Sequence, residues 1–184
     1  MGTAYSTELT NYEATPQVMV SPASATGKIR VWSDTIAAGT GDIDDDDILM
    51  MAEIPSNAKI KSIKLYNDDL DSGGSPALVT DGGIYNGNGL FNDTDGSATA
   101  YAAEAVIDRN CYGTVMTVLQ AGVTAGTEVR YETLGIETVG NFMWEDAGLT
   151  SDPGKMLRIA LTIETVAATA AAGDITMVVE YIVN

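Results

Sequence analysis

The chain has 184 residues, and its 26 acidic and 9 basic side chains give a formal charge of −17. It has no His and a single Cys, which excludes a Ser-His-Asp triad, a Cys-His dyad, His-ligated zinc and an intramolecular disulfide. Lys and Arg are too few to neutralise a phosphate backbone or an anionic membrane, so we expect no nucleic acid and no membrane partner. No apolar run approaches the roughly 18 residues that span a bilayer.

Residues 1–27 are polar and punctuated by Pro16 and Pro22, with one short apolar stretch, Val18-Met19-Val20. A segment of this composition buries little of itself, so we expect an extended N-terminal arm. Its first residues lack the basic start and apolar core of a secretory signal, which predicts synthesis in the cytoplasm. Residues 28–184 are then expected to form a single domain.

Strand patterning begins directly after the arm. Lys28–Ile36 and the apolar run Asp47–Ile54 are typical of strands, as is Lys59–Tyr66, where the alternation slips at Ser62-Ile63 and a bulge is expected. Two further strand-like pieces follow, Ala77–Thr80 and Gly83–Tyr85, which Asp81-Gly82 interrupts.

Helix is favoured at two places. Ala98–Asp108 is rich in Ala and has bulkier residues spaced four apart. Phe142–Ala147 is expected to form a helical turn that Gly148 closes. Thr114–Gln120 is rich in β-branched residues and too short for periodicity to decide between strand and helix.

The C-terminal third has the clearest alternation. Leu157–Glu164 and Ile175–Val183 each read as half-buried strands, and we expect the two to pair antiparallel across the small-residue connection Ala167–Gly173. Six to eight strands with turn-rich connections and no βαβ rhythm predict an all-β fold, an antiparallel jelly roll or β-sandwich with an N-terminal arm and one or two short helices.

Two acidic clusters, Asp42–Asp47 and Asp68–Asp71, have the oxygen ligands that Ca²⁺ prefers. Consecutive Asp residues in extended chain point to opposite faces, however, and Asn92–Gly96 resembles an EF-hand loop without its first and last ligands. Solvated loops are therefore the preferred interpretation, and we expect no metal and no cofactor.

Other patterns with catalytic associations are weak. Ser56 and Lys59 match the Ser-x-x-Lys spacing of penicillin-recognising enzymes, but Ser56 follows a proline in a turn that leads into a strand. Carboxylate pairs occur by chance in so acidic a chain, and Cys111 reads as a small buried thiol. Trp32 and Trp144 suit either the core or a sugar site. We expect no catalytic residues and no enzymatic activity.

The segment from Asn141 to Gly154 contains Trp-Glu-x-x-Gly-Leu followed by Asp-Pro, and the two alternating strands follow it. This C-terminal pattern, with Ala4–Thr7 and Gly27–Arg30 near the start, resembles structural proteins of tailed bacteriophages, in particular jelly-roll capsid decoration or cement proteins. The resemblance covers about a third of the chain, and its motifs are structural rather than catalytic.

The resemblance implies a non-enzymatic virion protein that binds the exterior of the capsid and stabilises it. Its implied partners are the major capsid protein and itself, as a homotrimer. The arm and the basic residues that follow it are the expected contact surface, which comprises Val18, Met19, Val20, Lys28, Arg30, Lys59, Lys61 and Lys64. The alternative is a head or tail appendage whose jelly roll binds host glycans through Trp and Asp side chains.

Overall fold

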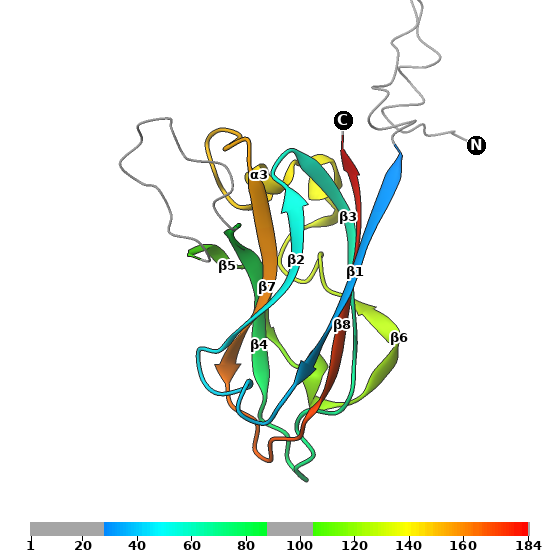
Figure 1. Cartoon of the computed structure of the whole chain (residues 1–184), viewed down its shortest axis with the longest axis vertical. Helices are drawn as coiled ribbons and strands as arrows, with labels where there is room; N and C mark the ends of the chain where they lie inside the picture. The colour runs from blue at the N-terminus through cyan, green and yellow to red at the C-terminus, as the bar shows by residue number, and fades with distance from the viewer. Residues whose placement is uncertain (1–27, 88–104, 184) are drawn as a thin grey trace, which may run out of the picture.

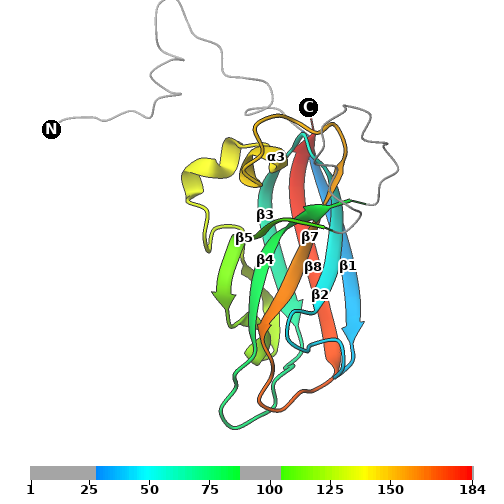
Figure 2. The same ribbon diagram turned by 90° about the vertical axis from the view of Figure 1, so that its left-hand side faces the viewer.

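A computed structural model describes residues 28–87 and 105–183. Within these ranges, eight antiparallel strands form two four-stranded sheets, drawn in Figures 1 and 2. Sheet A has the order β1-β8-β3-β6 and comprises β1 (Ile29–Ala38), β8 (Gly173–Val183), β3 (Ala58–Asn67) and β6 (Val123–Glu128). Sheet B has the order β2-β7-β4-β5 and comprises β2 (Ile48–Pro55), β7 (Met156–Thr165), β4 (Val79–Asn86) and β5 (Val106–Met116). The interleaved order is that of a jelly roll, so the predicted fold class is confirmed.

The core lies between the two sheets and follows from the alternation of their strands. In β3 the residues Ile60, Ile63 and Leu65 are fully buried while their neighbours are half-buried, and β8 alternates in the same way. Ile60 and Ile63 are three residues apart rather than two, because the register of β3 against β8 shifts between Ile60 and Ser62. The bulge expected near Ser62-Ile63 is therefore present, centred on Lys61.

The pairing predicted for the last two strands was wrong. Both strands form where expected, but β7 pairs with β2 and β4 in sheet B, and β8 pairs with β1 and β3 in sheet A. The small-residue connection thus crosses from one sheet to the other. Alternation shows that a strand has one buried face, and it does not say in which of two sheets the strand lies.

Two other local predictions need correction. Val106–Asp108, expected as the end of a helix, is the start of β5, and the preceding residues 98–104 lie outside the described ranges. Residues 79–86 form one continuous strand rather than two pieces, because Asp81 is neutralised within β4 by Arg109. The segment Thr114–Gln120, left open, ends β5 and then forms the 3₁₀ turn η1 (Val118–Gln120). β6 is a strand that the sequence pattern did not predict.

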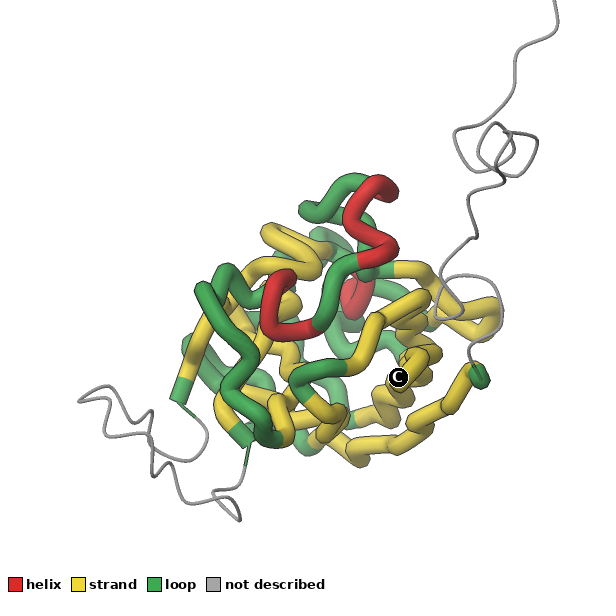
Figure 3. Tube along the Cα trace, turned by 90° about the horizontal axis from the view of Figure 1, so that it is seen from above, coloured by secondary structure: helices red, strands yellow, loops and turns green. Residues whose placement is uncertain are grey.

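The helical turns lie toward one side of the strand layers in the view from above (Figure 3). They are η2 (Ile136–Gly140) and α3 (Met143–Asp146), besides η1. The helical turn expected at 142–147 is confirmed, and Gly148 closes it with φ of +69°, a conformation that glycine adopts without strain. No helix among the described residues is long and apolar enough to cross a membrane.

Candidate interface surfaces

The basic residues near the start of the domain gather on sheet A. Lys59, Lys61 and Lys64 come from β3, Arg30 comes from β1, and Lys28 immediately precedes β1. The strand register aligns Ile29 and Lys59 on either side of Ile182, and Ser33 and Lys64 on either side of Val178. Residues opposite one another in adjacent strands point to the same face, so Lys59 and Lys64 share the outer face of sheet A.

Apolar side chains lie on the same outer face. Ile29 and Val31 are 62% and 61% exposed, although isoleucine and valine are among the most commonly buried residues. Arg30 alternates to the other side, where its partner Tyr181 packs against the core. We call the surface formed by Ile29, Val31, Lys59 and Lys64 the sheet A face. The structure therefore brings part of the predicted contact set together, whereas Val18, Met19 and Val20 lie outside the described residues.

Two lysines of β3 contact residues in the segment that carries the helical turns η2 and α3. The Lys59 ammonium lies 4.6 Å from the centre of the Phe142 ring, and Lys61 Nζ donates a 2.9 Å hydrogen bond to the carbonyl of Val139. Ser56 Oγ donates instead to Asp152, at 2.5 Å. Ser56 and Lys59 are thus engaged by different partners and do not form a nucleophile and base pair.

Three arginines outside this set form ion pairs with acidic residues of the domain. Arg130 and Asp146 form an ion pair of 2.8 Å in which both side chains are completely buried. Arg130 also donates to the hydroxyl and carbonyl of Thr138 at 3.1 and 3.0 Å, and lies 4.9 Å from the Tyr131 ring centre. Burial raises the pKa of Asp146 to about 6, against the opposing effect of Arg130, so the carboxyl is ionised and paired at neutral pH.

Arg109 bridges three carboxylates at the surface of sheet B. Its guanidinium contacts Asp46 at 3.0 Å, Asp81 at 3.2 Å and Glu164. The backbone of β5 reaches this position by crossing directly over Gly83, where an added Cβ would clash with the carbonyl oxygens of Asp108 and Arg109. Arg158 pairs with Glu53 at 3.5 Å.

The two acidic clusters serve the loops. Asp71 Oδ2 accepts the backbone N–H groups of Ala77, Leu78 and Ala168, and Oδ1 accepts that of Thr169, at 2.6 to 3.0 Å. Desolvation disfavours its charge, but these four donors outweigh it and hold the pKa of Asp71 well below its usual range. Asp71 thereby ties the β3–β4 loop to the β7–β8 connection.

Two acids of the first cluster act in the same way. Asp42 accepts the N–H of Gly39 at 2.8 Å, and Asp47 accepts that of Asp44 at 2.8 Å. Within the described ranges no three His, Cys, Asp or Glu side chains are placed to hold a metal ion. The EF-hand-like stretch 92–96 lies outside those ranges. Burial raises the pKa of Cys111, which keeps this thiol protonated.

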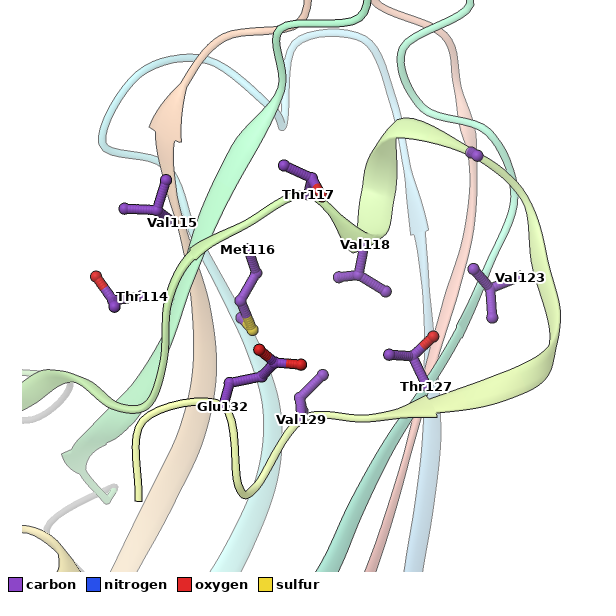
Figure 4. A pocket seen from close by; sticks show the side chains of 10 residues that line it. Thr114, Val115, Met116, Thr117, Val118, Val123, Thr127, Val129 and Glu132 are labelled. Carbon is purple, nitrogen blue, oxygen red and sulfur yellow. The ribbon is translucent and has the colours of Figure 1, made fainter. Parts of the chain in front are cut away.

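The sequence patterns did not predict a groove that lies at the edge strands β5 and β6, on the side of the sandwich opposite β1 and β2. It has a volume of about 340 Å³ and lies between the end of β5, η1 and β6 (Figure 4). Buried Met116 and Val129 lie at its base, and Glu132 is its charged lining residue. The signal that marks it is conformational, because Val115 at its rim has φ of +54°, a region that β-branched residues rarely occupy.

The fold matches chains from two phage capsids. A chain in the structure of the capsid of Ralstonia phage GP4 superposes with a TM-score of 0.61 at 21% identity, over 86% of each chain. A chain in the cyanophage Pam1 capsid asymmetric unit superposes with a TM-score of 0.56 at 18% identity, over 94% of this chain and 97% of the other. At such identities the likeness shows a shared fold. No family model and no curated protein sequence matches the chain.

Proposed function

We propose that this protein is a non-enzymatic structural component of a phage virion, which binds the exterior of the capsid as a decoration or cement protein. The observation that carries the proposal is the fold match to chains of two phage capsids, which extends over most of the chain in both comparisons. A rigid jelly roll whose loops are tied by buried polar groups suits a shell protein that must resist deformation.

The sheet A face is the surface we assign to the capsid. Arg109, Arg130 and Arg158 are paired with acids, whereas Lys59 and Lys64 form no ion pair with a carboxylate of the described residues. A −17 protein that keeps these cations beside exposed Ile29 and Val31 fits a partner surface that is acidic and partly apolar. The major capsid protein is the proposed partner, and the rest of the acidic surface keeps closely spaced copies from aggregating.

The test is binding of the purified protein to capsids that lack it, with Lys64→Glu against Lys155→Glu as the matched control. Both variants reverse one lysine charge, but Lys155 lies in the α3–β7 loop, where its carbonyl accepts the backbone N–H of Ser56, and it is not one of the four residues of the sheet A face. We expect Lys64→Glu to weaken capsid binding by about tenfold or more, since like charges across an interface cost several kcal/mol. Equal binding by both variants would place the contact elsewhere.

One observation favours glycan binding as a second candidate. Trp32 lines a cavity of about 250 Å³ between β1 and β2, together with Asp34, Glu53 and Arg158. An indole beside carboxylates and a guanidinium suits a sugar, although Trp32 Nε1 already donates to the carbonyl of Met51 at 3.2 Å. Trp144 instead stacks on Phe142, at 6.3 Å between ring centres. A glycan-array signal that Trp32→Ala abolishes and Trp144→Ala preserves would support this candidate over the capsid role.

A further inference from the structure

We infer that the groove between β5 and β6, shown in Figure 4, receives the Val18-Met19-Val20 segment of a second copy of this chain. The groove combines an apolar base with an open strand edge. Met116 is 6% and Val129 2% exposed, and Val118 packs partly against the core. β6 is the last strand of sheet A, so its outer edge has no neighbouring strand among the described residues. An extended apolar segment can bind there by strand addition, with its side chains in the groove.

The rim of the groove is held in a strained conformation. Val115 has φ of +54° and is 63% exposed, and its N–H donates to Asp81 Oδ1 at 3.0 Å. Asp81 is itself only slightly exposed and paired with Arg109. A β-branched residue in this region of backbone space costs free energy, and such strain is concentrated at binding sites. The Arg109–Asp81–Val115 chain of contacts thus preforms one wall of the groove.

The chemistry of the arm matches that of the groove. Residues 14–27 carry no charged side chain, and Val18-Met19-Val20 is the bulkiest apolar run within them. Because successive residues of a strand point to opposite faces, either register of this run presents an apolar side chain to the groove. Figure 4 shows Glu132, the charged lining residue, beside Met116, and an uncharged segment brings no second acid to it.

The topology favours a second copy over the same copy. The arm joins the domain at Ile29, on β1, and β1 and β2 are the edge strands on one side of the sandwich. The groove lies at β5 and β6, the edge strands on the other side. Copies standing side by side therefore place the arm of one against the groove of the next. Such a head-to-tail contact closes into a ring, such as a trimer, when the rotation between neighbouring copies permits it.

Chemical crosslinking of the full-length protein tests this contact directly. In a Cys111→Ser background, Met19→Cys is combined with Thr127→Cys in the groove, and a short bis-maleimide crosslinker is added. Met19→Cys with Val166→Cys is the matched control, since Val166 is 43% exposed in the β7–β8 connection. We expect crosslinked dimers and higher ring species from the Met19/Thr127 pair, and loss of these products in the control pair.

Four outcomes would overturn the inference. A crosslink confined to monomers would put the segment in its own groove. Equal crosslinking by both pairs would show that the arm does not bind the groove specifically. The absence of crosslinks in a protein that sediments as an oligomer would show that the arm does not bind the groove at all. The inference rests on the proposed decoration role and on the homotrimer that the sequence resemblance implies, so sedimentation and capsid binding are measured on the same samples. A monomer that still binds capsids would overturn the arm exchange and leave the decoration role standing.

Discussion

Two arginines of this chain meet carboxylates in opposite environments. Arg130 and Asp146 are both completely buried, whereas Arg109 is 34% exposed and bridges Asp46, Asp81 and Glu164 at the surface. A buried charge that loses its partner keeps its full desolvation penalty, while an exposed one is solvated by water. Burial therefore decides which of the two clusters the fold depends on, although the exposed one has more ion pairs.

The largest effect is expected from breaking the buried pair. Arg130→Met removes the partner that keeps the Asp146 carboxyl ionised and leaves that carboxyl unpaired in the interior, which costs about 3–5 kcal/mol and lowers the melting temperature by roughly 6–20 °C. Thermal denaturation followed by circular dichroism measures this shift. The double variant Arg130→Met/Asp146→Leu removes both charges and should recover most of the loss. A double variant no more stable than Arg130→Met would show that packing, not charge, governs this site.

A smaller loss is expected where β5 crosses β4. Gly83→Ala places a Cβ against the backbone carbonyls of Asp108 and Arg109, which must move, at a cost of about 1–3 kcal/mol. This movement also displaces Arg109 from its three acids. Gly74→Ala is the control, because no atom lies within 4 Å of the added Cβ. Urea denaturation of the two variants should differ clearly, and equal midpoints would contradict the described crossing.

Removing the exposed arginine should cost still less. Arg109→Gln is expected to lower stability by about 1 kcal/mol, and the difference from the unmodified protein should shrink as salt is added, because surface charges are screened. Denaturation at low and high ionic strength measures this. A loss as large as that of Arg130→Met, and independent of salt, would remove the distinction between the two arginines.

The smallest effect on stability belongs to the sheet A face. Lys64→Glu should change the free energy of unfolding by less than about 0.5 kcal/mol, as surface substitutions usually do, while weakening capsid binding. The same denaturation assay serves here. A destabilisation above this range would mean that Lys64 is part of the fold, and its effect on capsid binding would then have a structural cause.

Much of the fold could be predicted from the sequence, because strand alternation is a local property. β1, β2, β3, β7 and β8 and the turn at α3 lie within a few residues of their expected positions. The partners of β7 and β8 could not be predicted, since Leu157 and Ile175 need only a buried face and either sheet supplies one. Asp81 looked like a strand breaker because its partner Arg109 is distant in sequence.

The candidate surfaces were predictable only in part. The basic residues of β3 stand out in a chain of charge −17, and their alternation with Ile60 and Leu65 placed them on one face. The groove between β5 and β6 could not be predicted, because it depends on a left-handed valine and on a strand with few register pairs. The role of Asp146 was missed for the same reason as that of Asp81, since burial beside Arg130 is a tertiary property.

The copy number and position of the protein in purified virions test the central claim most directly. Quantitative mass spectrometry combined with a cryo-electron microscopy map of the capsid measures both. We predict that the protein occurs in many symmetry-related copies, with its jelly-roll density on the outer surface and sheet A facing the shell. Absence from virions, or a few copies confined to the neck or tail, would contradict it.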